Sequence, residues 1–326
     1  MKRCSGKQRR WLALVCAAAA CAQARGGNLA QANAALQAGQ ADSALAILDS
    51  LGQADANSAE AHNLRCRVLY TLEKWDAATK ECEQAAILDP QNSNFHMWLG
   101  RALGEKADSA SFVSAYSMAK RSRAEFEKAV ELNPRNAEAL AVVGEFYYSA
   151  PGVVGGGTGK AQSVAAKLDR LDPVRAHELR ASIAQENRDL GTAERELREA
   201  LAVSPHPAFQ WIKLASFHRR NKRWTEMDSA IQNGKAAAER DRHAAVALYY
   251  GATVLEKANR NPALAIKLLE MYLASQGQTE EAPAFVAHVY LARLEKQVGD
   301  TAGAKNERSA ALALASEYKP AQELKF

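Results

Sequence analysis

A pattern of roughly 34 residues recurs along this chain and limits its fold more than any other feature of the sequence. Residues 59–92, AEAHNLRCRVLYTLEKWDAATKECEQAAILDPQN, show it most regularly. An apolar stretch leads to a polar break at Glu73, a small residue stands at Ala78, and Pro90 closes the unit. A small residue lets two helices approach closely, and proline ends a helix because it lacks the N–H that the next turn needs. Each unit is therefore predicted to be a pair of antiparallel helices.

The pattern returns from residue 28 to residue 316, and the alanine-rich, proline-poor composition favours helices throughout. The predicted units, with approximate bounds, are residues 28–57, 59–92, 93–136, 137–173, 174–205, 208–241, 242–275 and 281–316.

This unit resembles the tetratricopeptide repeat (TPR), a helix–turn–helix motif of 34 residues. The resemblance covers nearly all of residues 25–326 and implies one all-α domain. It implies a right-handed superhelical solenoid of about eight TPR-like repeats, whose first helices line a concave groove. Such grooves bind peptides or protein segments, so the resemblance implies a protein-interaction scaffold.

Two units are longer than the repeat. Pro90 and Pro134 are 44 residues apart, and Pro134 and Pro173 are 39 apart. The extra residues are expected to reshape the groove at the third and fourth units. The combination HMWLGRALGEKA, a long second helix and ELNPRNAEAL makes residues 93–150 similar to the repeat domain of the regulator of microtubule dynamics family and its bacterial relatives. That similarity informs the fold and implies no microtubule role.

The first 24 residues are typical of a secretory signal peptide. A basic start, MKRCSGKQRR, precedes the apolar run WLALVCAAAACA and the small residues Ala22 and Ala24. The run is too short to span a bilayer, which needs about 20 apolar residues. We expect an exported protein, periplasmic or secreted. A buried N-terminal helix is the alternative for this segment, and cleavage before Cys21 would instead give an outer-membrane lipoprotein.

Removing this segment changes the charge balance. The whole chain has 42 basic and 37 acidic residues, and five of the basic residues lie within residues 1–24. The remainder is close to neutral, so nucleic-acid binding, which needs a basic surface, is not expected. No later segment is long and apolar enough to span a membrane.

A glycine-rich segment, PGVVGGGTGKAQS (residues 151–163), ends in the Gly-Lys of a phosphate-binding loop. That motif needs glycine at residue 154 and serine or threonine at residue 161, where this chain has Val154 and Ala161. We interpret the segment as a lengthened turn between two helices. Anion binding by its N–H groups is the remaining functional alternative.

Histidines and cysteines offer other candidates. His62, His96, His177 and His288 occupy equivalent places near the fourth position of a first helix. Neighbouring helices pack about 10 Å apart, too far for one metal ion, so we expect core or interface histidines and no metal site. Cys66 and Cys82 flank one turn symmetrically, so they either form a disulfide or are two small buried residues.

No catalytic motif or cofactor site is evident, and we expect a non-enzymatic scaffold or adaptor with an unidentified protein or peptide partner. The alternative is an envelope carrier that holds a small ligand or glycan in the concave groove. Candidate partner-binding residues are basic side chains of first helices: Arg67, Arg101, Arg219 and Arg220.

Overall fold

The computed structural model describes residues 27–326. The predicted signal peptide and Cys21 lie outside the described residues. Sixteen helices follow one another as eight hairpins, which confirms the predicted all-α array of about eight TPR-like repeats. None of the helices in the described part of the chain is long and apolar enough to cross a bilayer.

Each hairpin consists of a first and a second helix in chain order. The first hairpin pairs the helical residues 27–37 with α2 (Ala41–Asp49). The others are α4 (Ala59–Thr71) with α5 (Trp75–Leu88), α6 (Ser93–Asp108) with α7 (Phe112–Leu132), α8 (Ala137–Ser149) with α9 (Thr158–Leu168), α10 (Pro173–Glu186) with α11 (Leu190–Val203), α12 (Pro207–Arg220) with α13 (Trp224–Ala238), α14 (Val246–Ala258) with α15 (Pro262–Ala274), and α16 (Ala284–Gln297) with α17 (Thr301–Leu314).

The described residues also contain four short helices: α3 (Gln53–Ala56), η1 (Gly152–Val154), η2 (Arg242–Ala244) and α18 (Lys319–Gln322).

The hairpins are held together at a small residue in the second helix. The residue at the fourth position of the second helix is fully buried in seven hairpins. It is methionine in α13 and alanine in the other six: Ala44, Ala78, Ala161, Ala193, Met227, Ala265 and Ala304. A methyl side chain lets the first helix cross at close range, and larger side chains fill the space on either side. This is the physical reason for the small residues that recur in the sequence.

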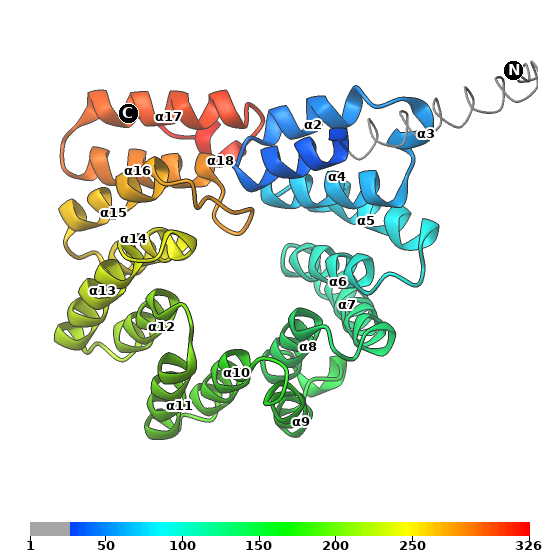
Figure 1. Cartoon of the computed structure of the whole chain (residues 1–326), viewed down its shortest axis with the longest axis horizontal. Coiled ribbons are helices and arrows are strands. Elements are labelled where there is room, and N and C mark those ends of the chain that lie inside the picture. The colour runs from blue at the N-terminus through cyan, green and yellow to red at the C-terminus, as the bar shows by residue number, and fades with distance from the viewer. Residues whose placement is uncertain (1–26) are drawn as a thin grey trace, which may run out of the picture.

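The array closes into a ring, with first helices on its inner side and second helices on its outer side (Figure 1). One apolar cluster contains residues from both ends of the described chain, among them Leu36 and Leu48 near the beginning and Phe285, Val289 and Tyr318 near the end. The sequence predicted a superhelix with a concave groove and did not predict that its ends would meet.

Polar contacts accompany this apolar seam. The Tyr318 hydroxyl donates to Glu73 at 3.0 Å, the Ser316 N–H donates to Asp42 at 2.8 Å, and Lys74 pairs with Glu317. The backbone is close-packed here as well. Gly39 has φ +67°, and a Cβ on it would lie 2.2 Å from the Ala284 nitrogen. The seam is thus a packed interface rather than a gap between two free ends.

Candidate functional site

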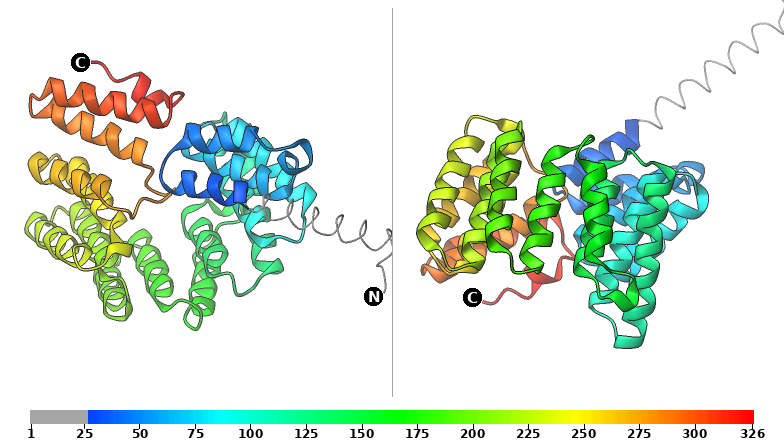
Figure 2. Two further views of the ribbon diagram at one scale, coloured as in Figure 1. Left: turned by 45° about the horizontal axis from the view of Figure 1, so that its top comes forward. Right: turned by 90° about the horizontal axis from the view of Figure 1, so that it is seen from below.

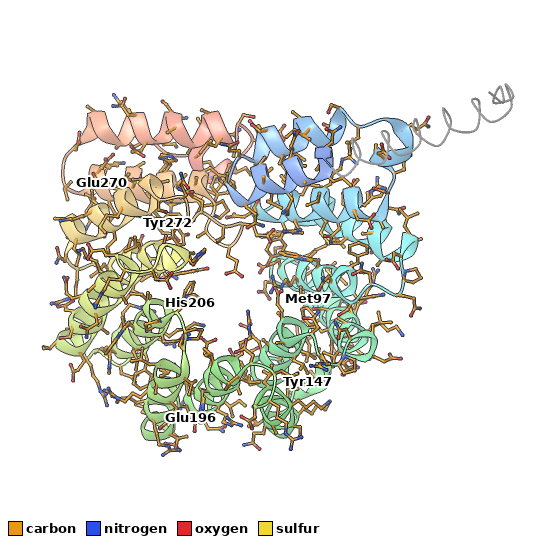
Figure 3. The ribbon with its side chains drawn as sticks, in the orientation of Figure 1. Met97, Tyr147, Glu196, His206, Glu270 and Tyr272 are labelled. Atoms are coloured by element: carbon orange, nitrogen blue, oxygen red, sulfur yellow. A yellow bond between two sulfur atoms is a disulfide. The ribbon has the colours of Figure 1, made fainter. Side chains whose placement is uncertain are left out.

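The inner side of the ring is the candidate binding surface, because the side chains of the first helices point toward its centre (Figure 3). Ion pairs link neighbouring first helices across this surface. Arg101 of α6 pairs with Glu138 of α8 at 2.8 Å, and Lys213 of α12 pairs with Glu178 of α10 at 3.5 Å. These ion pairs compensate part of the charge on the inner side.

Arg67, a predicted partner-binding residue, contributes to the closure of the ring. Its guanidinium donates two hydrogen bonds, of 2.8 and 2.7 Å, to the carboxylate of Glu280. Glu280 lies in the segment 275–283 between α15 and α16, and both side chains are less than one-fifth exposed. The structure gives this arginine an internal partner instead of a free cation for a ligand.

Arg101, another predicted partner-binding residue, belongs to the lining of a groove. The guanidinium carbon stands 4.7 Å from the centre of the Trp98 ring, a distance typical of a cation–π contact. The groove runs between the first helices α6 and α8, over α7, and has a volume of about 620 Å³. It is called the α6–α8 groove below. Its lining includes Tyr70, Glu105, Phe126, Val142, Glu145 and Phe146.

Carboxylates dominate the polar lining of this groove. The Tyr70 hydroxyl donates to Glu105 at 3.0 Å, while Glu145 is exposed at the rim. Burial, with the negative charge and hydrogen bond of Glu105, raises the pKa of Tyr70 above its ordinary value. The charge of Arg101 is offset by Glu138, so the negative charges of the lining prevail.

Arg219 lies in a second, smaller pocket between α12 and α14. This α12–α14 pocket has a volume of about 340 Å³ and is also lined by Phe209, Lys213, Tyr250 and Lys257. The Arg219 Nε is buried and has no hydrogen-bond acceptor. The neighbouring Arg220 is outside the lining, and burial, followed by the charge of Arg219, lowers its pKa. The four arginines therefore do not form one site.

The glycine-rich segment uses its N–H groups within the protein. The N–H groups of Gly155, Gly156 and Gly157 donate to the carbonyls of Gly152, Pro151 and Tyr147, respectively. The Lys160 ammonium donates to the Gly155 carbonyl at 2.9 Å, and Ala161 is fully buried. The segment is the lengthened turn that the repeat predicted. The segment precedes α9 and follows the helix α8, so it lacks the strand that a phosphate-binding loop needs, and three of its N–H groups are already engaged within the protein.

Four histidines form a repeated contact that the sequence analysis missed. In each of four hairpins, the Nδ1 of a first-helix histidine lies 2.5–2.8 Å from a glutamate of the second helix: His62–Glu81, His96–Glu125, His177–Glu196 and His288–Glu307. The spacing is 19 residues in three pairs and 29 in the second, whose unit is ten residues longer. This common spacing is the signal that could have revealed the pairs.

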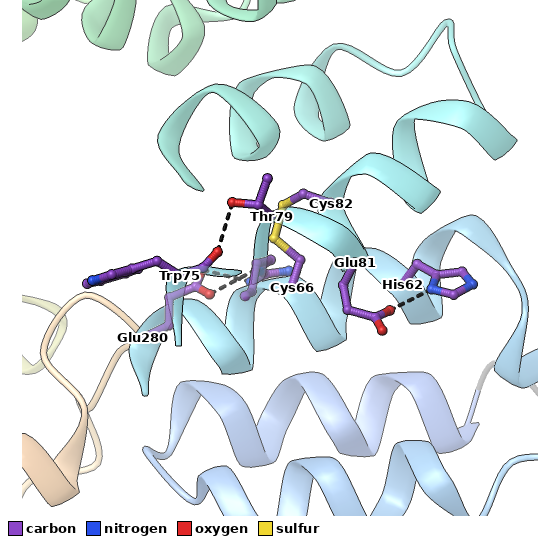
Figure 4. The surroundings of a disulfide bond; sticks show 8 residues. His62, Cys66, Trp75, Thr79, Glu81, Cys82 and Glu280 are labelled. Atoms are coloured by element: carbon purple, nitrogen blue, oxygen red, sulfur yellow. Dashed lines mark hydrogen bonds and ion pairs between the residues drawn. A yellow bond between two sulfur atoms is a disulfide. The ribbon is translucent and has the colours of Figure 1, made fainter. Parts of the chain in front are cut away.

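A disulfide joins the two helices of the second hairpin. Cys66 of α4 and Cys82 of α5 are bonded, with Cα atoms 5.2 Å apart, and the His62–Glu81 pair lies beside them (Figure 4). Both cysteines are fully buried. Of the two alternatives that the sequence left open for these cysteines, the structure contains the bond.

Within residues 27–326, no group of three or more histidine, cysteine, aspartate or glutamate side chains is arranged to hold a metal ion. The α6–α8 groove has a larger volume than the α12–α14 pocket. Its lining includes apolar, aromatic and charged side chains from three consecutive first helices, α4, α6 and α8.

No family model matches the sequence, and neither does any curated protein. Among solved structures, the chain is similar to TTC0263, a thermophilic TPR protein of Thermus thermophilus. The identity is 17% and the TM-score 0.51, over 59% of this chain and 98% of that one. PilF of Pseudomonas aeruginosa also matches, with 15% identity and a TM-score of 0.37 over 81% and 95% of the two chains. By its helix pairs and by the likeness to the Thermus protein, this chain has the fold of tetratricopeptide repeat proteins.

Proposed function

We propose that this protein is a non-enzymatic scaffold or adaptor that holds a segment of a partner protein on the inner side of its ring. The α6–α8 groove is the observation that carries the proposal. It combines an apolar floor with a polar rim, the arrangement by which a surface excludes water at its centre and orients a ligand at its edge. The fold itself is used mostly for protein interactions.

The compartment we propose is outside the cytoplasm, in the bacterial envelope or the medium. The composition of residues 1–24 supports this, and so does the Cys66–Cys82 disulfide, because such bonds persist mainly in oxidising compartments. Fusing residues 1–40 to alkaline phosphatase, which is active only after export, tests the compartment. Activity of the fusion supports export, and its absence contradicts it. Loss of membrane association in Cys21→Ser would identify the lipoprotein alternative.

Site-specific cross-linking in cells tests the binding surface. Ser149 belongs to the lining of the groove and Ser163 of α9 does not, and both are exposed. A photoreactive phenylalanine analogue in place of Ser149 should capture one protein partner, while the same residue in place of Ser163 should not. Equal capture at both positions, or none at Ser149, would contradict the proposal.

The α12–α14 pocket favours a second candidate function, that of a carrier for a small ligand or glycan. Phe209 and Tyr250 present aromatic rings whose centres are 5.8 Å apart, next to Lys213 and Lys257. Aromatic faces with nearby polar groups suit a sugar or a small anion. Native mass spectrometry of the protein purified from its own cells tests this. A bound small molecule that is lost in Tyr250→Ala supports the carrier, and an unliganded chain does not.

A further inference from the structure

The two segments that exceed the repeat meet at one place in the fold. Helix α7 has 21 residues against 14 in α5, which makes it about two turns longer. The α6–α7 hairpin consequently projects beyond its neighbours, as the right-hand view of Figure 2 shows. The lengthened turn at residues 151–157 packs on this helix, where the Arg123 guanidinium donates to the Val154 carbonyl at 3.1 Å.

The contact between these two segments depends on Gly155. This residue has φ +99°, and a Cβ on it would overlap the Arg123 guanidinium at 1.7 Å. Glycine at this position permits both the left-handed backbone of the turn and its close approach to the Arg123 side chain. Both segments border the α6–α8 groove, since Ala119 of α7 and Val154 of the turn belong to its lining. Two independent insertions thus shape the same groove.

An apolar stripe on α7 extends the floor of this groove. Phe126, Ala119, Ala115 and Phe112 are separated by seven, four and three residues, so they share one face of the helix. Phe126 is 7% exposed at one end, and Phe112 is 88% exposed at the other. Ala119 and Phe126 belong to the lining of the groove, and Ala115 and Phe112 continue the same helix face beyond it. The stripe spans about 21 Å, the length of some 14 helical residues.

Acidic side chains border the α6–α8 groove. Glu105 and Asp108 of α6 and Glu145 of α8 lie in the lining of the groove. The negative charges of Glu105 and Glu145 both contribute to the raised pKa of Tyr70, so their fields reach the same point. An acidic rim along an apolar floor is complementary to a segment that carries basic and apolar side chains.

We propose that the α6–α8 groove and the exposed N-terminal turns of α7 bind a basic, amphipathic segment of a partner protein. Its apolar side chains lie on the stripe from Phe126 to Phe112, and its lysine or arginine side chains face Glu105 and Glu145. This inference rests on the proposed function and specifies the chemistry of its partner. An anionic bilayer is disfavoured as the occupant, because the same carboxylates repel it.

Binding of two matched peptides tests the proposal. One is an amphipathic peptide of about 14 residues made of lysine, leucine and alanine, long enough to cover the stripe as a helix. The other carries glutamate in place of lysine. Fluorescence anisotropy with the full chain should show binding of the lysine peptide and weaker binding of the glutamate peptide, with an affinity for the lysine peptide that falls as salt rises.

Variants locate the binding. Glu105→Gln combined with Glu145→Gln should weaken binding of the lysine peptide roughly tenfold, because two complementary charges are lost. Phe112→Ser should weaken it as well, and this side chain is too exposed to matter for folding. The control is Glu60→Gln combined with Glu199→Gln, which removes two exposed carboxylates elsewhere on the molecule and should leave the affinity unchanged.

Three results would overturn the inference. The first is equal binding of both peptides. The second is an equal loss of affinity for the lysine peptide in the Glu60/Glu199 control. The third is binding to anionic phospholipid vesicles, lost in Phe112→Ser, when neither peptide binds. Cross-linking at Ser149 separates this inference from the proposed function. A partner captured there without lysine-peptide binding refutes the basic segment and leaves the scaffold standing, whereas no capture at Ser149 refutes the scaffold itself.

Discussion

At the residue scale, the turns inside most of the hairpins contain a left-handed backbone conformation that few side chains favour. The second residue after the first helix has positive φ in five hairpins, and it is glycine in two of them, at Gly39 and Gly299. Glu73, Arg188 and Lys222 adopt φ values of 57–60° at the same place. A side chain with a Cβ is strained in this conformation by about 1 kcal/mol relative to glycine.

Lys222→Gly is therefore expected to stabilise the protein by about 0.5–1 kcal/mol, because it relieves this strain where the backbone is already left-handed. Chemical denaturation of the full chain measures the change. Lys213→Gly, in the interior of α12, is the control and should destabilise by about 1 kcal/mol. A destabilised Lys222→Gly variant would show that its side chain stabilises the turn in another way.

Glu295 gives stability a dependence on pH. Burial, followed by the charges of Glu307 and Asp300, raises the pKa of this carboxyl from 4.5 to about 7. A raised pKa in the folded state favours the protonated form, so stability is fully present below pH 4.5 and is lost as pH rises through about 7. Glu295→Gln should melt at a higher temperature than wild type at pH 8 and at a similar temperature at pH 4.5. Parallel pH profiles of the two proteins would contradict this.

At the element scale, the sequence predicts the helix pairs, and it predicts the contacts that join the paired helices only in part. Small residues such as Ala78 and Ala161 predict where the helices cross, because burial requires them to be small. The histidine at position 96 is recognisable as equivalent to others, but its partner Glu125 is not, because charged residues on a helical face usually meet solvent. The shape of the α6–α8 groove depends on the projection of α7 and on the packing of the 151–157 turn, which spacing alone does not define.

The His96–Glu125 pair should strengthen the third hairpin at mildly acidic pH. The hydrogen bond to Glu125 raises the pKa of His96 above 6.5, against a smaller opposing effect of burial. Its contribution is present below pH 6.5 and is lost as pH rises through the folded-state pKa. His96→Gln should therefore lower the melting temperature more at pH 5.5 than at pH 8.5. Glu125→Gln should reproduce this pattern, and a loss that does not vary with pH would contradict it.

The disulfide should hold α4 and α5 together in the unfolded as well as the folded chain. The bonded cysteines are 16 residues apart, and closing a loop of this length contributes about 3 kcal/mol. Replacing both with alanine should lower the free energy of unfolding by up to this amount. Titration of the denatured, unreduced mature protein should detect no free thiol from Cys66 or Cys82. Two free thiols would restore the alternative of two buried, unpaired cysteines.

At the scale of the whole molecule, closure of the ring could not be predicted from the repeat. Each unit adds a small rotation that depends on side-chain packing, and whether eight of them bring the ends together depends on their sum. The seam pairs residues far apart in the chain, such as Arg67 with Glu280 and Tyr318 with Glu73. No local sequence pattern predicts such pairs.

Gly39→Ala tests whether the seam stabilises the ring. A Cβ at Gly39 would overlap the Ala284 backbone, while a Cβ at Gly299, also at positive φ, meets nothing within 4 Å. Gly299→Ala therefore reproduces the backbone strain without the overlap. Gly39→Ala should lose at least about 1 kcal/mol more stability than Gly299→Ala and should show a larger radius of gyration in solution scattering. Equal effects of the two substitutions would mean that the ends are not packed in solution.

Closure also bears on how such a chain changes during evolution. An open array gains or loses a hairpin with little consequence for the remaining units, which is why its length drifts easily among relatives. Here a lost hairpin would pull Tyr318 away from Glu73, and a gained one would push the ends past each other. We therefore expect closure to restrict the number of repeats and changes in length to fall within a unit. The two insertions around α7 are the form of change that such a ring permits.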